Sequence, residues 1–114
     1  MKELQLTARF VIHDGKLTEF KRLAERCMES VRTKDSGTLQ YDWFVNAGGT
    51  ECVVRERYRD SAAVLEHATN LGELMPAIAA ISDPVIEIYG APTDELLEAL
   101  AGLAPRVYSA YQSL

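Results

Sequence analysis

Residues 38–58 read TLQYDWFVNAGGTECVVRERY, and this stretch decides the predicted fold. Large apolar residues alternate along 38–46, which is the period-2 pattern of a half-buried strand. A second extended run follows from Glu51 to Tyr58. The connection between them, Ala47 to Thr50, is too short for a crossover and contains two glycines. The two runs therefore predict an antiparallel β-hairpin.

A strand and a helix precede this hairpin. Apolar and mostly polar residues alternate along 3–13, and the turn residues Asp14 and Gly15 end that strand. From Lys16 to about Thr33, apolar residues recur every three or four positions, which is the spacing of one helix face. The turn residues of 34–37 then lead into the hairpin.

A helix and a strand follow the hairpin. Asp60 is a candidate N-cap for a helix that runs toward Gly72. The apolar run 74–81, with a proline near its start, predicts a short helix that continues the crossover. The β-branched and aromatic run 85–89 then predicts a fourth strand.

The order of elements is typical of the α+β class, with the split βαββαβ pattern of a ferredoxin-like fold. It predicts a four-stranded antiparallel sheet with helices on one face. A helix over 95–103 and an extended tail over 106–113 form a C-terminal helix and strand extension. We expect one domain over residues 1–114, with a core of about 3–92 and an extension of about 93–114.

The sheet face without helices needs either water or a partner. Large residues occupy both registers of the second strand, Trp43 and Phe44, so we expect a homodimer that packs sheet to sheet. Arg9, Arg55 and Arg57 fall on the registers opposite the apolar faces of their strands. We expect them to face the partner sheet and to form ion pairs between subunits, in preference to binding an anion.

Composition disfavours several classes of function. The chain has 12 basic and 17 acidic residues, a formal net charge of -5, which disfavours nucleic acid and anionic lipid as main partners. No apolar run approaches the ~20 residues of a membrane span. Residues 1–5 lack the apolar stretch of a signal peptide, so a cytoplasmic location is expected. Cys27 and Cys52 are then expected to be reduced thiols, and their spacing fits no metal site.

Three stretches in this order resemble the antibiotic biosynthesis monooxygenase (ABM) family. The first is FVIHDGKLTEF at 10–20, a strand, a Gly-Lys turn and the start of a helix. The second combines GTLQY at 37–41 with RERY at 55–58 and SAAVLEH at 61–67. The third is EIYGAP at 87–92, which is similar to the last core strand of the family. The resemblance covers about residues 4–92 and implies a subunit that pairs into a dimeric α/β barrel.

The resemblance also implies a chemistry. Oxygenases of this family need no metal or flavin, because an electron-rich phenol or hydroquinone reacts with oxygen once it is deprotonated. The protein then supplies a dry pocket, a base and hydrogen bonds to the anion. We therefore expect no cofactor and a small aromatic or quinol-type substrate. Ala8 and Tyr58 stand where the haem-degrading branch has Asn and Trp, which disfavours haem breakdown. The alternative function is a non-catalytic dimeric module that binds a small apolar ligand or stabilises an assembly.

His67 matches the histidine of the family and is the candidate catalytic base; the alternative is a surface or helix-capping histidine. Glu56 and Tyr58 share a register that should face the helices. A buried Glu56 is either a second acid or base near the substrate, or the partner of an arginine in a structural ion pair. Tyr58 is either an aromatic wall with a hydroxyl donor, or part of the core.

Three further aromatic residues are candidates for substrate binding. Tyr41, Trp43 and Tyr89 are expected to line a pocket of aromatic rings with polar tips. Trp43 is alternatively an anchor of the dimer interface, where tryptophan is enriched. The spacing of these residues leaves both possibilities open.

Overall fold

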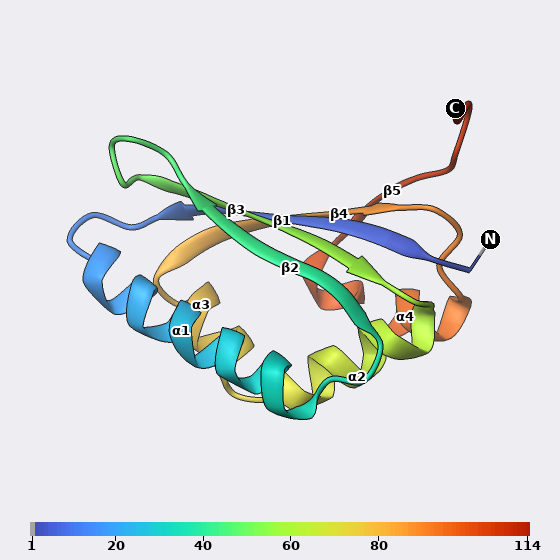
Figure 1. The fold of residues 1–114 in the computed structure, drawn as a ribbon. Helices are drawn as coiled ribbons and strands as arrows, with labels where there is room; N and C mark the ends of the chain where they lie inside the picture. The colour runs from blue at the N-terminus through green and yellow to red at the C-terminus, as the bar shows by residue number, and fades with distance from the viewer. Residues whose placement is uncertain (1) are drawn as a thin grey trace.

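A five-stranded mixed sheet forms the upper layer of the computed structural model, which describes residues 2–114 (Figure 1). The strands are β1 (Leu4–Ile12), β2 (Thr38–Val45), β3 (Glu51–Tyr58), β4 (Ser82–Tyr89) and β5 (Arg106–Tyr108). Their order across the sheet is β2-β3-β1-β4-β5. The strands β1 to β4 pair antiparallel with one another, and β5 runs parallel to β4.

The predicted ferredoxin-like core is therefore confirmed. The prediction of a four-stranded antiparallel sheet is wrong in one respect, because the sheet has a fifth strand, β5, which is parallel to β4. The tail pairs with β4 within the same chain, with Arg106 opposite Glu87 and Tyr108 opposite Tyr89. The amide of Gly90 donates to the Tyr108 carbonyl at 2.9 Å, and the Tyr89 and Tyr108 rings stack with centroids 5.5 Å apart. The physical reason is that β4 would otherwise be an edge strand with unpaired backbone groups.

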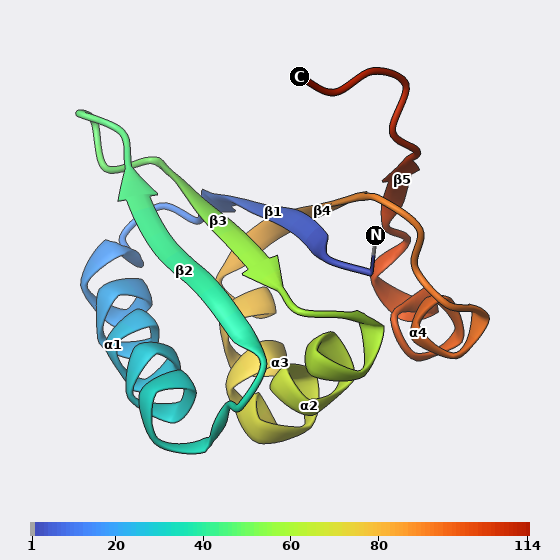
Figure 2. The ribbon, with the colours of Figure 1, turned by 45° about the vertical axis from the view of Figure 1, so that its right-hand side comes forward.

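The helices lie on one side of this sheet (Figure 1). They are α1 (Leu17–Lys34), α2 (Ser61–Leu71), α3 (Leu74–Ala79), α4 (Asp94–Ala99) and a 3-10 turn, η1 (Ala101–Leu103). Figure 2 shows α1 and α4 at opposite ends of the helical layer, with α2 and α3 between them. No helix within residues 2–114 is both long enough and apolar enough to cross a membrane.

Side-chain caps start two of these helices. The predicted cap Asp60 accepts a hydrogen bond from the amide of Ala63 at 2.9 Å. Thr93 caps α4 by accepting from the amide of Leu96 at 3.2 Å. Gly72 ends α2 with a φ of 51°, a value that costs glycine little because it has no Cβ. These caps place α2 and α4 at defined points beneath the sheet.

The buried apolar residues form two clusters. The α1 cluster joins α1 to the strands above it and includes Ala8, Phe20, Leu23, Cys27, Tyr41 and Val54. The α4 cluster lies at the other end of the sheet and includes Leu4, Leu6, Tyr58, Val64, Leu96 and Leu100. Polar side chains are buried where the two clusters meet, and these form the candidate site.

The sheet face without helices carries arginines paired inside the chain. Arg9 contacts Glu51 at 2.7 Å, and Arg57 contacts Glu3 at 3.2 Å. Within residues 2–114, Arg55 has no such ion pair. Partners within the chain therefore account for two of the three arginines that we expected to pair between subunits.

Candidate functional site

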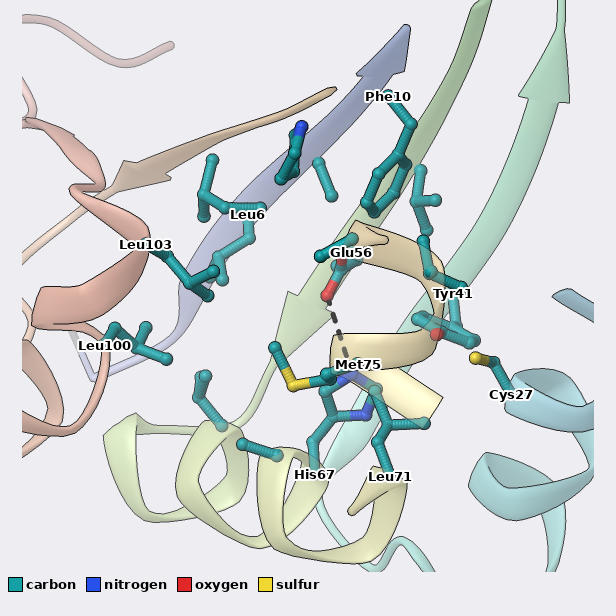
Figure 3. A pocket seen from close by; sticks show the side chains of 18 of the residues that line it. Leu6, Phe10, Cys27, Tyr41, Glu56, His67, Leu71, Met75, Leu100 and Leu103 are labelled. Carbon is teal, nitrogen blue, oxygen red and sulfur yellow. Dashed lines mark ion pairs between the residues drawn. The ribbon is translucent and has the colours of Figure 1, made fainter. Parts of the chain in front are cut away.

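A cavity of about 90 Å³ lies between the sheet and the helices, where the α1 and α4 clusters meet (Figure 3). Most of its lining side chains are aliphatic or aromatic. The polar exceptions are few: the Tyr41 hydroxyl, the Trp43 indole, the Glu56 carboxyl and the His67 imidazole, beside the Cys27 thiol. An apolar cavity with a few convergent polar groups is the usual form of a small-molecule site.

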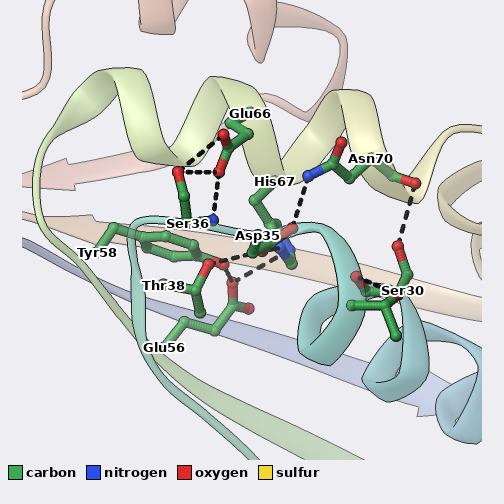
Figure 4. Close-up of polar contacts among 10 residues, drawn as sticks. Ser30, Asp35, Ser36, Thr38, Glu56, Tyr58, Glu66, His67 and Asn70 are labelled. Carbon is green, nitrogen blue, oxygen red and sulfur yellow. Dashed lines mark hydrogen bonds and ion pairs between the residues drawn. The ribbon is translucent and has the colours of Figure 1, made fainter.

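His67 lies on the buried face of α2 and is 6% exposed. Its Nδ1 lies 2.8 Å from Oδ2 of Asp35 (Figure 4). Burial alone raises the pKa of Asp35, but hydrogen bonds from Asn70, Thr38 and His67 outweigh burial and lower it. Asp35 is therefore ionised at neutral pH and only accepts hydrogen bonds, so Nδ1 carries the proton. When the ring is neutral, Nε2, on the side of Glu56, is therefore the nitrogen with the free lone pair.

Glu56 faces the helices from β3 and is 8% exposed, as its predicted register requires. The Tyr58 hydroxyl donates a hydrogen bond to Oε1 of Glu56, and Nε2 of His67 lies 3.9 Å from the same oxygen. Burial raises the pKa of Glu56, and the electrostatic interaction with His67 and the Tyr58 hydrogen bond offset only part of this rise. The site therefore combines a carboxyl that resists ionisation with an imidazole beside it.

Among the residues that the structure describes, no arginine pairs with Glu56. The predicted structural ion pair with an arginine is therefore wrong, and Glu56 contacts His67 and Tyr58 instead. The reason is the register of β3. Because side chains alternate between faces, Arg55 and Arg57 point away from the helices when Glu56 points toward them.

The turn between α1 and β2 holds Asp35 in place. The backbone amide and the hydroxyl of Ser36 both donate to the carboxylate of Glu66 on α2, at 2.7 Å and 3.0 Å. A Cβ on Gly37 would lie 2.5 Å from the Cβ of Ala63, so only glycine lets the chain approach α2 this closely. Asp35 is thus fixed against the helix that carries His67.

Tyr41 and Trp43 both line the cavity. The Tyr41 ring packs against His67 and Trp43, with centroid distances of 5.1 Å and 5.6 Å. The Trp43 Nε1 is buried and has no hydrogen-bond partner within residues 2–114. Burial raises the pKa of the Cys27 thiol to about 11, so this thiol is protonated and weakly nucleophilic at neutral pH.

Tyr58 and Tyr89 lie outside the cavity lining. Tyr58 is fully buried and contacts the His67 ring at a centroid distance of 5.2 Å, so it supports the site from behind Glu56. Tyr89 lies on the other face of the sheet and donates to Glu87 at 2.7 Å. Ile88 takes the inward position of β4, so the alternation of the strand directs Tyr89 outward and removes it from the predicted pocket.

Asp35 and Asn70 are site residues that the sequence analysis did not identify. Asn70 is one helical turn after His67 on α2 and donates to Oδ1 of Asp35 at 2.9 Å. Two polar residues spaced by three positions on an otherwise apolar helix face indicate a buried polar partner, and this signal was available in the sequence. Within residues 2–114, no three His, Cys, Asp or Glu side chains are grouped to hold a metal ion.

Comparison with known families decides the classification. The family model described as "Antibiotic biosynthesis monooxygenase" (ABM) matches residues 5–73. The chain belongs to the ABM family. The resemblance identified from the sequence motifs is therefore confirmed, and the family match includes Asp35, Glu56 and His67.

Solved structures of similar fold extend beyond the family match. MupZ from Pseudomonas fluorescens superposes with a TM-score of 0.87 at 24% identity, covering 100% of this chain and 94% of that chain. SnoaB from Streptomyces nogalater, described as a cofactor-independent oxygenase, has a TM-score of 0.69 at 17% identity, covering 82% and 96%. Rv0793 from Mycobacterium tuberculosis has a TM-score of 0.69 at 23% identity, covering 81% and 96%. A search of curated protein sequences found no match. At these identities the similarity shows the fold.

Proposed function

We propose that this ABM-family chain is a cofactor-independent monooxygenase that acts on a small aromatic or quinol-type compound bound in the cavity. The observation that carries the proposal is the buried Asp35–His67 pair, whose Nε2 lies beside Glu56 in an apolar cavity. Membership of the ABM family and the fold shared with SnoaB, a cofactor-independent oxygenase, support it.

His67 is the general base in this proposal. Its Nε2 takes the proton of a substrate hydroxyl, and the Asp35 carboxylate stabilises the imidazolium that results. The deprotonated substrate supplies the electrons that reduce oxygen, so that one oxygen atom is incorporated into the substrate and the other leaves as water. The apolar walls exclude water from the anion, and Tyr41 and Trp43 pack against the substrate ring. Glu56, held by Tyr58, hydrogen-bonds the reacting oxygen.

Oxygen uptake tests this proposal. We expect uptake with a panel of hydroquinones and anthrone-like phenols to survive a metal chelator and to fall by about 100-fold or more in His67→Ala. His13→Ala is the matched control, because His13 is exposed and pairs with Asp83 at 3.0 Å, away from the cavity. Uptake no faster than the buffer blank would contradict the oxygenase and favour the non-catalytic ligand-binding module.

We also propose that two copies pack through the open sheet face. Phe44 is 55% exposed, and Val11 and Tyr108 are also exposed, so the sheet surface carries apolar area that a second sheet would cover. Light scattering should give about 25 kDa at micromolar concentration, twice the 12.7 kDa of one chain. A mass of 12.7 kDa under those conditions would exclude this dimer.

A further inference from the structure

The cavity has an aromatic arm on one side of the Glu56–His67 contact, formed by Phe10, Tyr41 and Trp43. The Tyr41 and Trp43 rings meet edge to face, and the Phe10 and Trp43 rings are nearly parallel with centroids 6.3 Å apart. Figure 3 shows Phe10 and Tyr41 to the right of the dashed Glu56–His67 contact. Rings arranged in this way favour a planar ring as ligand, through edge-to-face and stacked contacts.

An aliphatic arm lies on the other side of the contact, formed by Leu6, Leu100 and Leu103 (Figure 3). The last two come from the segment that contains α4 and η1, beyond residue 73 where the family match ends. The amide of Thr93 donates to Ser61 Oγ at 3.1 Å and ties this segment to the start of α2. Leu100 is 6% exposed, whereas Leu103 is half-buried on the single turn of η1.

We propose that the ligand of this cavity is a hydroxylated aromatic ring that carries an alkyl or acyl chain. The ring occupies the aromatic arm, the hydroxyl lies between Glu56 and His67, and the chain runs along the aliphatic arm to Leu103. Because Oε1 of Glu56 and Nε2 of His67 are 3.9 Å apart, one oxygen to the side of the line that joins them can hydrogen-bond to both groups. The inference rests on the proposed function. It adds the alkyl or acyl chain of the ligand and the residues that limit the length of that chain.

The size of the cavity makes Leu103 the residue that limits the chain. An engineered dry cavity of about 150 Å³ binds benzene, and the cavity here is smaller, about 90 Å³. A ring with a chain therefore needs space from a wall that can yield. Leu100 packs within the α4 cluster, but Leu103 only lies against it, so the side chain of Leu103 is the one that moves or sets the limit.

A binding series of para-alkylphenols, from p-cresol to p-octylphenol, tests the inference without requiring turnover. Trp43 is the only tryptophan of the chain and lines the aromatic arm, so its fluorescence reports binding. Affinity should rise about fourfold per added methylene until the arm is full, and then stop rising. The chain length at which affinity stops rising is the break. In Leu103→Ala the break should move to a longer chain, and in Leu103→Phe it should move to a shorter one.

Leu97→Ala is the matched control, since Leu97 also packs against the α4 cluster but does not line the cavity, and the break should not move. An affinity that does not depend on chain length, or a break that is the same in all four proteins, would overturn the inference. Chain-length selection in this series, together with no oxygen uptake from the hydroquinones and anthrone-like phenols, would support the ligand class and contradict the oxygenase. The two proposals therefore fail separately.

Discussion

Replacing Asp35 by Asn is expected to lower the rate of the proposed reaction by between about 100-fold and 10,000-fold, with the fold intact. The Asp35 carboxylate accepts a hydrogen bond from Nδ1 of His67 at 2.8 Å, and this fixes the proton on that nitrogen. An amide at position 35 can present its NH₂ group to Nδ1 instead. The proton then moves to Nε2, and the nitrogen beside Glu56 loses the lone pair that accepts the substrate proton.

Two measurements separate this effect from a loss of structure. Oxygen uptake gives the rate, and ¹⁵N-resolved NMR of the imidazole shows which nitrogen of His67 carries the proton. Asp42→Asn is the control, since Asp42 is an exposed aspartate whose side chain, within residues 2–114, hydrogen-bonds only to Gln40 on the same strand. An Asp35→Asn protein that keeps the full rate, or that keeps the proton on Nδ1, would show that Asp35 does not set the tautomer.

The sequence predicted most of the core fold because each element carries its own periodicity. The alternation in 51–58 correctly directs Glu56 toward the helices and Arg55 away from them. The fifth strand was not predicted as part of this sheet. It has only three residues, Arg106–Tyr108, and its pairing depends on α4 and η1 returning the chain to the free edge of β4. A long-range contact of this kind leaves no local pattern in the sequence.

The candidate site was predicted in part for a related reason. His67 was identified by resemblance, and the register of β3 placed Glu56 near it. Asp35 was interpreted as a turn residue, because a Lys-Asp-Ser-Gly turn explains an aspartate without any partner. Its role becomes visible only when α2 is packed against the turn. Tyr89 is a residue that was predicted for the site but lies outside it. An aromatic residue at a strand end suggested a pocket, although the alternation of β4 favoured Ile88 for the inward position.

The stability of the wild-type protein is expected to fall as pH rises through the ionisation of Glu56. Burial raises the pKa of Glu56 above its ordinary value of 4.5, so the folded state keeps this proton to a higher pH than the unfolded chain. The unfolded state then binds fewer protons, and the free energy of unfolding falls with pH over that range. Asp35 acts in the opposite sense, because its lowered pKa stabilises the fold above 3.8 and this contribution is lost as pH falls.

Glu56→Gln removes the first of these two effects. The variant keeps an oxygen that accepts from Tyr58 but has no charge to bury, so its stability relative to wild type should increase with pH by about 1 to 3 kcal/mol. Urea unfolding followed by Trp43 fluorescence from about pH 4 to about pH 9 measures the difference. Groups far from residue 56 titrate alike in the two proteins, so their contributions cancel in the difference.

Glu98→Gln is the matched control, since Glu98 is exposed on α4 and its difference from wild type should not change with pH. A Glu56→Gln difference that is equally flat would mean that Glu56 has the same pKa in the folded and the unfolded chain, so that it is charged in the fold at neutral pH. A charged Glu56 accepts hydrogen bonds and repels a phenolate, whereas a neutral one donates a hydrogen bond to it. The pH dependence of stability therefore determines whether the cavity holds Glu56 in the form that the proposed anion requires.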